Sequence, residues 1–298
     1  MKKEIILIIF LALVMPLVSA GLFDWLKEKV QLAPAQPTDV RVQVRNIAPT
    51  IENINSIPAV NLNPAPSTTS VIFTFTARDR NSAADLNDAT ASANFSKIGE
   101  QTRTSPCTFQ SQPNSREKIY QCTVNMQYYD DAGTWSIGVN VQDQGGLVAA
   151  SSSSTFTVNL LRDITLSQAT INFPSVAPED VDIISTIPTT IANNGNFEVP
   201  VDGNIRITAF DLQGETTLSE IIPASNFRAT GNSGIATVCS TGTPLVDSIA
   251  VSIPSTILPR GPAGSNTEDI TNCITLVPIG ISNQFYSATG GRAWIIGI

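Results

Sequence analysis

Apolar and polar residues alternate with a period of two through much of the chain after residue 40. Successive side chains of a β-strand point to opposite faces, so this alternation predicts strands with one buried face. Strands separated by short polar turns are typical of antiparallel sandwiches. The predicted buried sets of the first half are Val71, Phe73, Phe75 and Ala77; Tyr120, Cys122, Val124 and Met126; Trp135, Ile137, Val139 and Val141; and Phe156 with Val158.

The second half carries the same alternation in shorter pieces. Its expected strands are 169–173, 197–201, 205–209, 249–253 and 293–296, with Gly, Pro and Asn clusters between them. Each half has a normal domain size and enough residues to bury a core. We therefore predict an all-β fold with two tandem antiparallel sandwiches, at 40–160 and 161–298.

The N-terminus has the composition of a secretory signal peptide. Lys2 and Lys3 precede an uncharged apolar run from Ile5 to Val18, and the small residues Ser19 and Ala20 follow. We expect 1–20 to be a signal peptide that is cleaved after Ala20, which makes the protein extracellular or exposed at the cell surface. An uncleaved anchor is the alternative, because the uncharged stretch continues through Phe23 and reaches about the length of a membrane span.

A short amphipathic helix is predicted directly after the cleavage site. Its apolar residues recur at four-residue intervals, and a Pro-rich linker completes the segment 21–39. Such a short helix is marginal in water, so its apolar side needs a membrane interface, a partner or its own domain. Simple docking or disorder is the alternative. The candidate contact residues are Leu22, Phe23, Trp25, Leu26 and Val30.

Four cysteines lie two in each half of the chain. Export to an oxidising compartment favours disulfides over free buried thiols, which are the alternative. Four cysteines allow three connectivities, and one bridge per half is the simplest. We predict the pairs Cys107 with Cys122 and Cys239 with Cys273.

Composition excludes several classes of function. The chain has no histidine, so Ser-His-Asp and Cys-His nucleophile pairs and His-ligated metals cannot be built. Loss of Lys2, Lys3 and Glu4 with the signal leaves 15 basic and 24 acidic residues, a formal charge of −9. Such a charge repels phosphate backbones, so we expect no nucleic-acid partner. Because the sequence offers no reactive constellation, we also expect no enzymatic activity. No cofactor is expected, with calcium as the one exception to consider.

Four aspartates could gather at one pole of the first sandwich. Carboxylates with backbone carbonyls are the ligands of calcium, and the candidates are Asp79, Asp85, Asp88 and Asp143. The alternative is that they are solvated loop acids. The only glycosylation sequon begins at Asn94, which would face solvent because its neighbours alternate inward; an unmodified surface Asn is the alternative.

The longest polar, strand-poor segments are 78–88, 99–116 and 261–271, and we expect the first two to form the contact surface, with Asp79, Asp85 and Asp88 as the main polar contributors. The segments exceed the two to five residues that ordinary hairpins need, which favours a binding role over a merely tolerated loop. In the second segment, a Cys107 disulfide would tether the loop and reduce the cost of ordering it on contact with a partner.

The first half resembles the PKD-like and cadherin-like immunoglobulin-fold domains. The resemblance rests on the turn Asp131-Ala132-Gly133-Thr134-Trp135 before one strand and Asp143-Gln144-Gly145-Gly146 after it. The second half is similar to immunoglobulin-like domains of prokaryotic, especially archaeal, surface proteins, through 171–178 and the turn Asn193-Asn194-Gly195-Asn196.

These resemblances imply a non-catalytic secreted or cell-surface protein for adhesion, cell-envelope structure or partner binding. Its expected partners are other surface proteins or envelope glycans. The alternative is an accessory binding region associated with an extracellular carbohydrate-active enzyme. A fold of this kind specifies little about function, so the site must carry the argument.

Overall fold

The computed structural model describes residues 38–201, 203–231, 237–254, 256–288 and 292–298. The predicted signal peptide and amphipathic helix therefore lie outside the described residues, as do Leu22, Phe23, Trp25, Leu26 and Val30. The chain forms two compact units, Met1–Arg45 and Asn46–Ile298. All the described strands lie in the second unit, and the predicted domain boundary after residue 160 stays a prediction.

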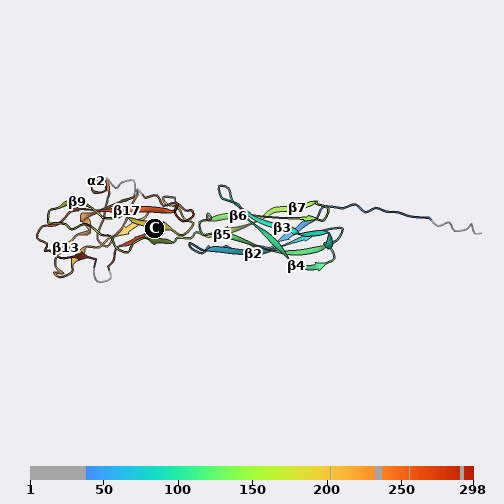
Figure 1. Cartoon of the computed structure of the whole chain (residues 1–298), viewed down its shortest axis with the longest axis horizontal. Helices are drawn as coiled ribbons and strands as arrows, with labels where there is room; N and C mark the ends of the chain where they lie inside the picture. Colours follow the sequence, from blue (N-terminus) through green and yellow to red (C-terminus); the bar gives the residue numbers. More distant parts are fainter. Residues whose placement is uncertain (1–37, 202, 232–236, 255, 289–291) are drawn as a thin grey trace, which may run out of the picture. The chain divides into compact units, whose positions relative to one another are not determined.

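Seven antiparallel strands form the first lobe of this unit (Figure 1). They hydrogen-bond in the order β1-β2-β5-β4-β3-β6-β7. Most of them run for 11 or 12 residues, long for globular strands, and in β2, β5 and β6 the alternation of buried residues continues over most of that length. The bounds are β1 Thr50–Ile54, β2 Thr68–Arg78, β3 Leu86–Ser96, β4 Arg103–Asn114, β5 Glu117–Gln127, β6 Gly133–Asp143 and β7 Val148–Val158, with a 3-10 turn η1 at Ala83–Asp85.

The core of the first lobe consists of the residues that alternation predicts. Trp135, Tyr120 and Phe75 are its largest fully buried side chains. The rings of Phe73 on β2 and Phe95 on β3 lie 5.6 Å apart, which brings side chains of two sheets into one core. The prediction of an all-β antiparallel fold is confirmed in this half.

Strand β4 corrects one sequence-based expectation. The segment 99–116 was expected to be a long polar loop, yet most of it is β4. Its first residues, Arg103–Pro106, pair with β3, and residues from Cys107 onward pair with β5. The side chains from Thr108 to Asn114 are exposed, so hydrogen bonding of the backbone keeps this strand extended without an apolar face.

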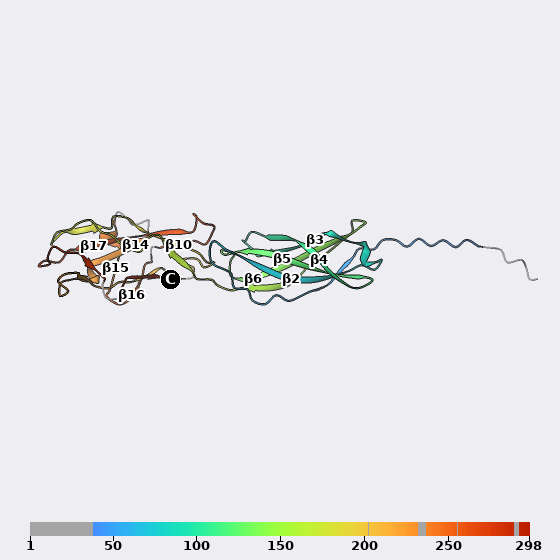
Figure 2. The same ribbon diagram turned by 60° about the horizontal axis from the view of Figure 1, so that its bottom comes forward.

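Short strands make up the second lobe, in one six-stranded sheet and two three-stranded sheets. Only β17 is long, and it pairs with β14, β10 and β9 (Figure 2). The bounds are β8 Ile164–Leu166, β9 Val181–Ile184, β10 Thr189–Asn193, β11 Arg206–Thr208, β12 Leu212–Gly214, β13 Ile221–Ile222, β14 Phe227–Gly231, β15 Thr243–Pro244, β16 Ala250–Ser252, β17 Thr267–Leu276, β18 Tyr286–Ser287 and β19 Ile295–Gly297, with η2 at Ala224–Asn226 and α2 at Val238–Thr241.

Two of the predicted strands of the second half are absent from the described structure. Residues 169–173 and 197–201 join no ladder, although Phe197 and Val199 are buried. Prolines follow or end both segments, and a proline cannot donate to a ladder. The predicted strands at 205–209, 249–253 and 293–296 correspond to the shorter β11, β16 and β19.

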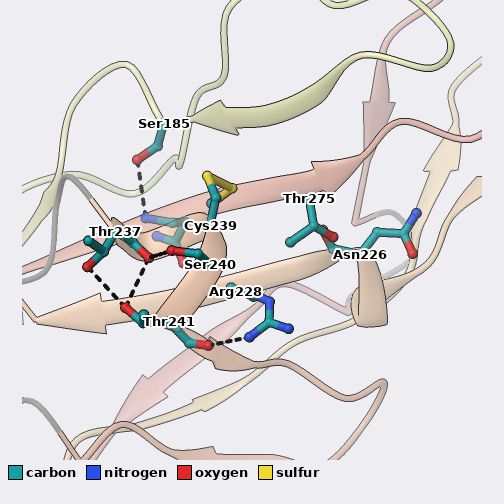
Figure 3. Close-up of a disulfide and its surroundings, with 11 residues drawn as sticks. Ser185, Asn226, Arg228, Thr237, Cys239, Ser240, Thr241 and Thr275 are labelled. Atoms are coloured by element: carbon teal, nitrogen blue, oxygen red, sulfur yellow. Dashed lines mark hydrogen bonds between the residues drawn. A yellow bond between two sulfur atoms is a disulfide. The ribbon is translucent and has the colours of Figure 1, made fainter.

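Both disulfides have the predicted pairing. Cys107 on β4 lies directly opposite Cys122 on β5, so that bridge joins two strands already paired by hydrogen bonds. Cys239 on α2 is bonded to Cys273 on β17, as Figure 3 shows. The short helix is held further by hydroxyl hydrogen bonds from Ser240 and Thr241 to the carbonyl of Thr237.

A polar junction connects the two lobes within their common unit. The fully buried Asn196 accepts a hydrogen bond from the Leu161 N–H and donates to the carbonyls of Asp130 and Asn159. A Cβ on Gly195 would lie 2.1 Å from the Leu161 carbonyl oxygen, so the close approach there requires glycine.

A second set of contacts completes this junction. The buried Tyr128 hydroxyl donates to the Gly261 carbonyl at 3.0 Å. Arg260 pairs with Glu100 across the two lobes at 2.7 Å and donates to the carbonyl of Tyr129. The segment between the lobes is therefore held on both sides, which distinguishes it from a free linker.

Candidate metal centre

Three of the four predicted aspartates meet at one end of the first lobe. Asp79 follows the last residue of β2, Asp85 ends η1, and Asp143 is the last residue of β6. One carboxylate oxygen from each lies within 4.8 Å of the others. Asp79 and Asp143 are almost fully buried, at 0% and 1% exposure, and Asp85 is half-buried.

Local backbone hydrogen bonds bring the three residues together. The Asp79 N–H donates to the Arg116 carbonyl, so the end of β2 stays against the turn before β5. The Ser82 hydroxyl accepts from the Ala84 N–H and caps η1, which places Asp85. The Gln144 N–H then donates to the Asp85 carbonyl, which fixes the end of β6 beside η1.

Both carboxylate oxygens of Asp143 have partners. Oδ1 accepts the Leu147 N–H at 2.8 Å, and Oδ2 accepts the side-chain amide of Asn46 at 2.9 Å. The Ile47 N–H donates to the Asn81 side-chain oxygen at 3.0 Å. These bonds attach the segment before β1 to the acidic group. Sequence reasoning missed Asn46 and Asn81, because neither lies near Asp143 along the chain.

Asp79 is the exception among the three. Its Oδ1 accepts the N–H groups of Asn81 and Ser82, at 2.7 and 3.3 Å. Its Oδ2 is buried and has no hydrogen-bond partner among the described residues. A buried acceptor without a hydrogen-bond partner lowers stability by about 1–3 kcal/mol, and by more if it is charged. This unpaired oxygen is therefore the strongest indication that the site holds a ligand.

Asp88, the fourth predicted acid, lies outside this group. Its Oδ1 accepts hydrogen bonds from Lys118 Nζ and from the Tyr120 hydroxyl, each at 2.7 Å. Burial raises the pKa of Tyr120, and the hydrogen bond to Asp88 raises it further. Asp88 thus balances the charge of the buried Lys118 and is not available to the other three acids.

The other predicted sites are placed as follows. Most of the segment 78–88 is a turn and η1 between β2 and β3, whereas 261–271 includes the first five residues of β17. Asn94 lies on β3 between the buried Ala93 and Phe95, and its half-buried side chain lies over Gly138. Its glycosylation stays a prediction.

Two further groups of polar residues occur in the described structure. Asp182 lies near Cys239 and Cys273, but both sulfurs are used by the disulfide and cannot ligate a metal as thiolates. A shallow hollow of about 260 Å³ is lined by Thr50, Glu52, Arg78, Arg80 and Arg116. Arg78 and Arg80 are close in sequence, but Arg116 and Thr50 come from other parts of the chain, which is why sequence reasoning missed this group.

The three-acid group has the donor chemistry of a site for a hard divalent cation. All its ligand atoms are carboxylate oxygens, which suit calcium and magnesium, and a soft ligand for zinc or copper is absent from the described surroundings. Several ion pairs elsewhere in the described structure use other carboxylates, those of Asp39, Asp88, Glu100, Asp130, Asp131 and Glu198.

Comparisons with known proteins give no family assignment. No protein-family model matches the chain, and no curated protein matches it. Within the described residues, no helix is both long enough and apolar enough to cross a membrane. Two disulfides are typical of proteins from oxidising, extracellular environments.

Proposed function

We propose that the protein is a non-catalytic, secreted or cell-surface module that serves in adhesion, cell-envelope structure or partner binding. The observation that carries this proposal is the pair of disulfide-bonded β-cores joined by the buried polar junction at Asn196 and Tyr128. Such an arrangement holds surfaces at a fixed spacing, which is what an extracellular spacer or adhesion module requires.

The finer identity of the domains belongs to this proposal. The strand order β1-β2-β5-β4 beside β3-β6-β7 is compatible with an immunoglobulin-like sandwich. We propose that the first lobe is a PKD-like or cadherin-like domain and that the second is an immunoglobulin-like domain of the prokaryotic, archaeal surface type. The turn markers described for the sequence support this assignment.

Exposure at the cell surface can be tested on intact cells of the source organism. An antibody raised against the full chain should label intact cells, and a protease added outside should remove the signal. Permeabilised cells serve as the control for total protein. Labelling that requires permeabilisation would contradict the proposed location.

The non-catalytic part of the proposal needs a separate experiment. The purified full chain should release no reducing sugar from envelope polysaccharides, because it has few of the aromatic platforms that bind sugars. Retention on a polysaccharide without hydrolysis would favour the accessory binding region of a carbohydrate-active enzyme. Release of products would overturn the non-catalytic assignment.

A further inference from the structure

The buried Oδ2 of Asp79 lies within a group of three carboxylates. Asp79 is completely buried, and no described group donates to this oxygen. Two more carboxylates, of Asp85 and Asp143, each place an oxygen within 4.8 Å of the Asp79 carboxylate. Like charges at such separations repel one another, and water screens them poorly at a buried site. A cation among the three would remove this repulsion and give the buried oxygen a partner.

The oxygen separations allow all three carboxylates to reach one cation. Two oxygens bound to the same calcium ion at about 2.3–2.6 Å lie at most roughly 5 Å apart, and the three ligand oxygens lie within 4.8 Å of one another. Calcium accepts irregular coordination completed by water, whereas magnesium demands near-ideal octahedral geometry, so an irregular set of protein carboxylates suits calcium better.

We propose that Asp79, Asp85 and Asp143 bind one calcium ion, with Asp79 Oδ2 as the buried ligand. Asp88 takes no part, because it is bound to Lys118 and Tyr120. This inference does not depend on the proposed function, since a calcium site can stabilise a protein of any activity.

The ion would connect three parts of the first lobe that are distant in sequence. It joins the end of β2, the turn η1 and the end of β6. Because Asn46 donates to Asp143 and Asn81 accepts from Ile47, it would also stabilise the attachment of the segment before β1. Calcium should therefore protect residues 46–48 from proteolysis and raise the melting temperature of the chain.

The test uses the full chain freed of metal with EGTA and titrated with calcium chloride in a calorimeter. We expect one calcium per chain, with a dissociation constant of about 10⁻⁵–10⁻³ M, the range of sensor and extracellular sites. At tenfold excess over that constant, the melting temperature should rise by roughly 3–6 °C. Magnesium chloride at the same concentration is the comparison ion and should bind more weakly.

Two variants should weaken binding and a third should not. Asp79→Asn keeps the shape and the acceptor for Asn81, and Asp85→Asn changes a half-buried residue, so that the fold survives in at least one variant. Each should weaken calcium binding at least tenfold. Asp88→Asn is the matched control, since it changes a nearby acid outside the site, and its calcium affinity should equal that of the wild type.

Two results would overturn the proposal. The first is the absence of both binding heat and a calcium-dependent melting shift in the wild type. The second is an equal loss of affinity in Asp88→Asn and in the site variants, which would indicate diffuse acidic binding.

Discussion

The two lobes contain buried polar groups of different kinds. In the first lobe the buried polar residues are charged and lie at the ends of strands or beside them: Asp79, Lys118, Asp130 and Asp143. In the second lobe they are neutral: Ser185, Thr189, Asn193, Asn196, Thr230, Thr256, Asn266, Thr271 and Asn272. The strands of the first lobe are long, and charged side chains are buried near their ends. The strands of the second lobe are short, and amide and hydroxyl side chains are buried among them.

This difference follows from strand length. A long ladder satisfies its own backbone groups, so polar side chains are needed only where it stops. Short strands leave many carbonyl and N–H groups unpaired, and buried amides such as Asn193 and Asn266 supply partners for them. Measurements on each lobe can therefore separate stability due to ladders from stability due to side-chain hydrogen bonds.

The largest expected difference between the lobes concerns their disulfides. Replacing Cys239 and Cys273 by Ala should lower the free energy of unfolding by about 4 kcal/mol, against about 3 kcal/mol for Cys107 and Cys122, because the closed loop is longer. The sequence separations are 34 and 15. Cys107 and Cys122 also lie opposite each other in the β4–β5 ladder, and the hydrogen bonds of that ladder remain when the disulfide is removed. Urea titration of the two double variants measures both values, and a larger loss in the first lobe would reverse the comparison.

A buried ion pair is the next test. Arg103 pairs with Asp130, whose side chain is fully buried. Arg103→Met should cost about 3 kcal/mol, because it leaves a buried carboxylate without its cation. Asp130 keeps the hydrogen bond from the Gln127 N–H, which limits the loss. The control is Arg103→Met combined with Asp130→Leu, which removes both charges and should recover most of the stability in thermal melts. Failure of this rescue would contradict the ionic origin of the loss.

The amides of the junction should have a smaller effect. Asn196→Ala removes three hydrogen bonds and leaves the Leu161 N–H without an acceptor, a loss of about 2 kcal/mol. Hydrogen exchange at the Leu161 amide should become faster. Asn194→Ala is the matched control, since the Asn194 side chain contacts only Thr165 through a weak 3.3 Å bond. Equal exchange rates in the two variants would show that the junction does not depend on Asn196.

The smallest expected effect is a dependence on pH in the second lobe. The pKa of Glu220 is lowered from 4.5 to about 2 by the Ser282 N–H, followed by the hydroxyls of Tyr286 and Ser282 and the amide of Gln284. A lowered folded pKa contributes stability above the unfolded pKa and loses it on acidification. The melting temperature of the wild type should therefore exceed that of Glu220→Gln above pH 5, and the gap should shrink toward pH 2. A gap that is constant with pH would contradict this assignment.

The first lobe was predictable from the sequence because its buried face follows the strand period over long runs. Residues such as Phe73, Val124 and Ile137 are buried where alternation places them. The segment from Thr108 to Asn114 was not predictable, since it is mostly polar, has no alternating apolar face and is extended because β5 offers a partner. A pairing of this kind depends on residues elsewhere in the chain, so no local pattern indicates it.

The second lobe and the acidic group were predicted only in part. Phe197 and Val199 alternate like a strand and are buried, but the backbone there pairs irregularly because Pro200 follows. The sequence predicted that Asp79, Asp85 and Asp143 belong to one acidic group, and the turn at η1 brings their carboxylates together. Asp88 follows η1, in β3, and its carboxylate pairs with Lys118 of β5. This contact depends on how the strands are arranged in the fold, so the local sequence does not predict it.

The scarcity of lysine affects how this protein can be detected. Past Lys29 the sequence contains only Lys97 and Lys118. Both amines are engaged, Lys97 with Asp131 and the Ala132 carbonyl, and Lys118 with Asp88 and the Leu86 carbonyl. Their side chains are only 21% and 10% exposed. Amine-reactive biotin and amine crosslinkers will therefore label the folded lobes poorly, and detection with such reagents depends on the lysines that precede residue 30.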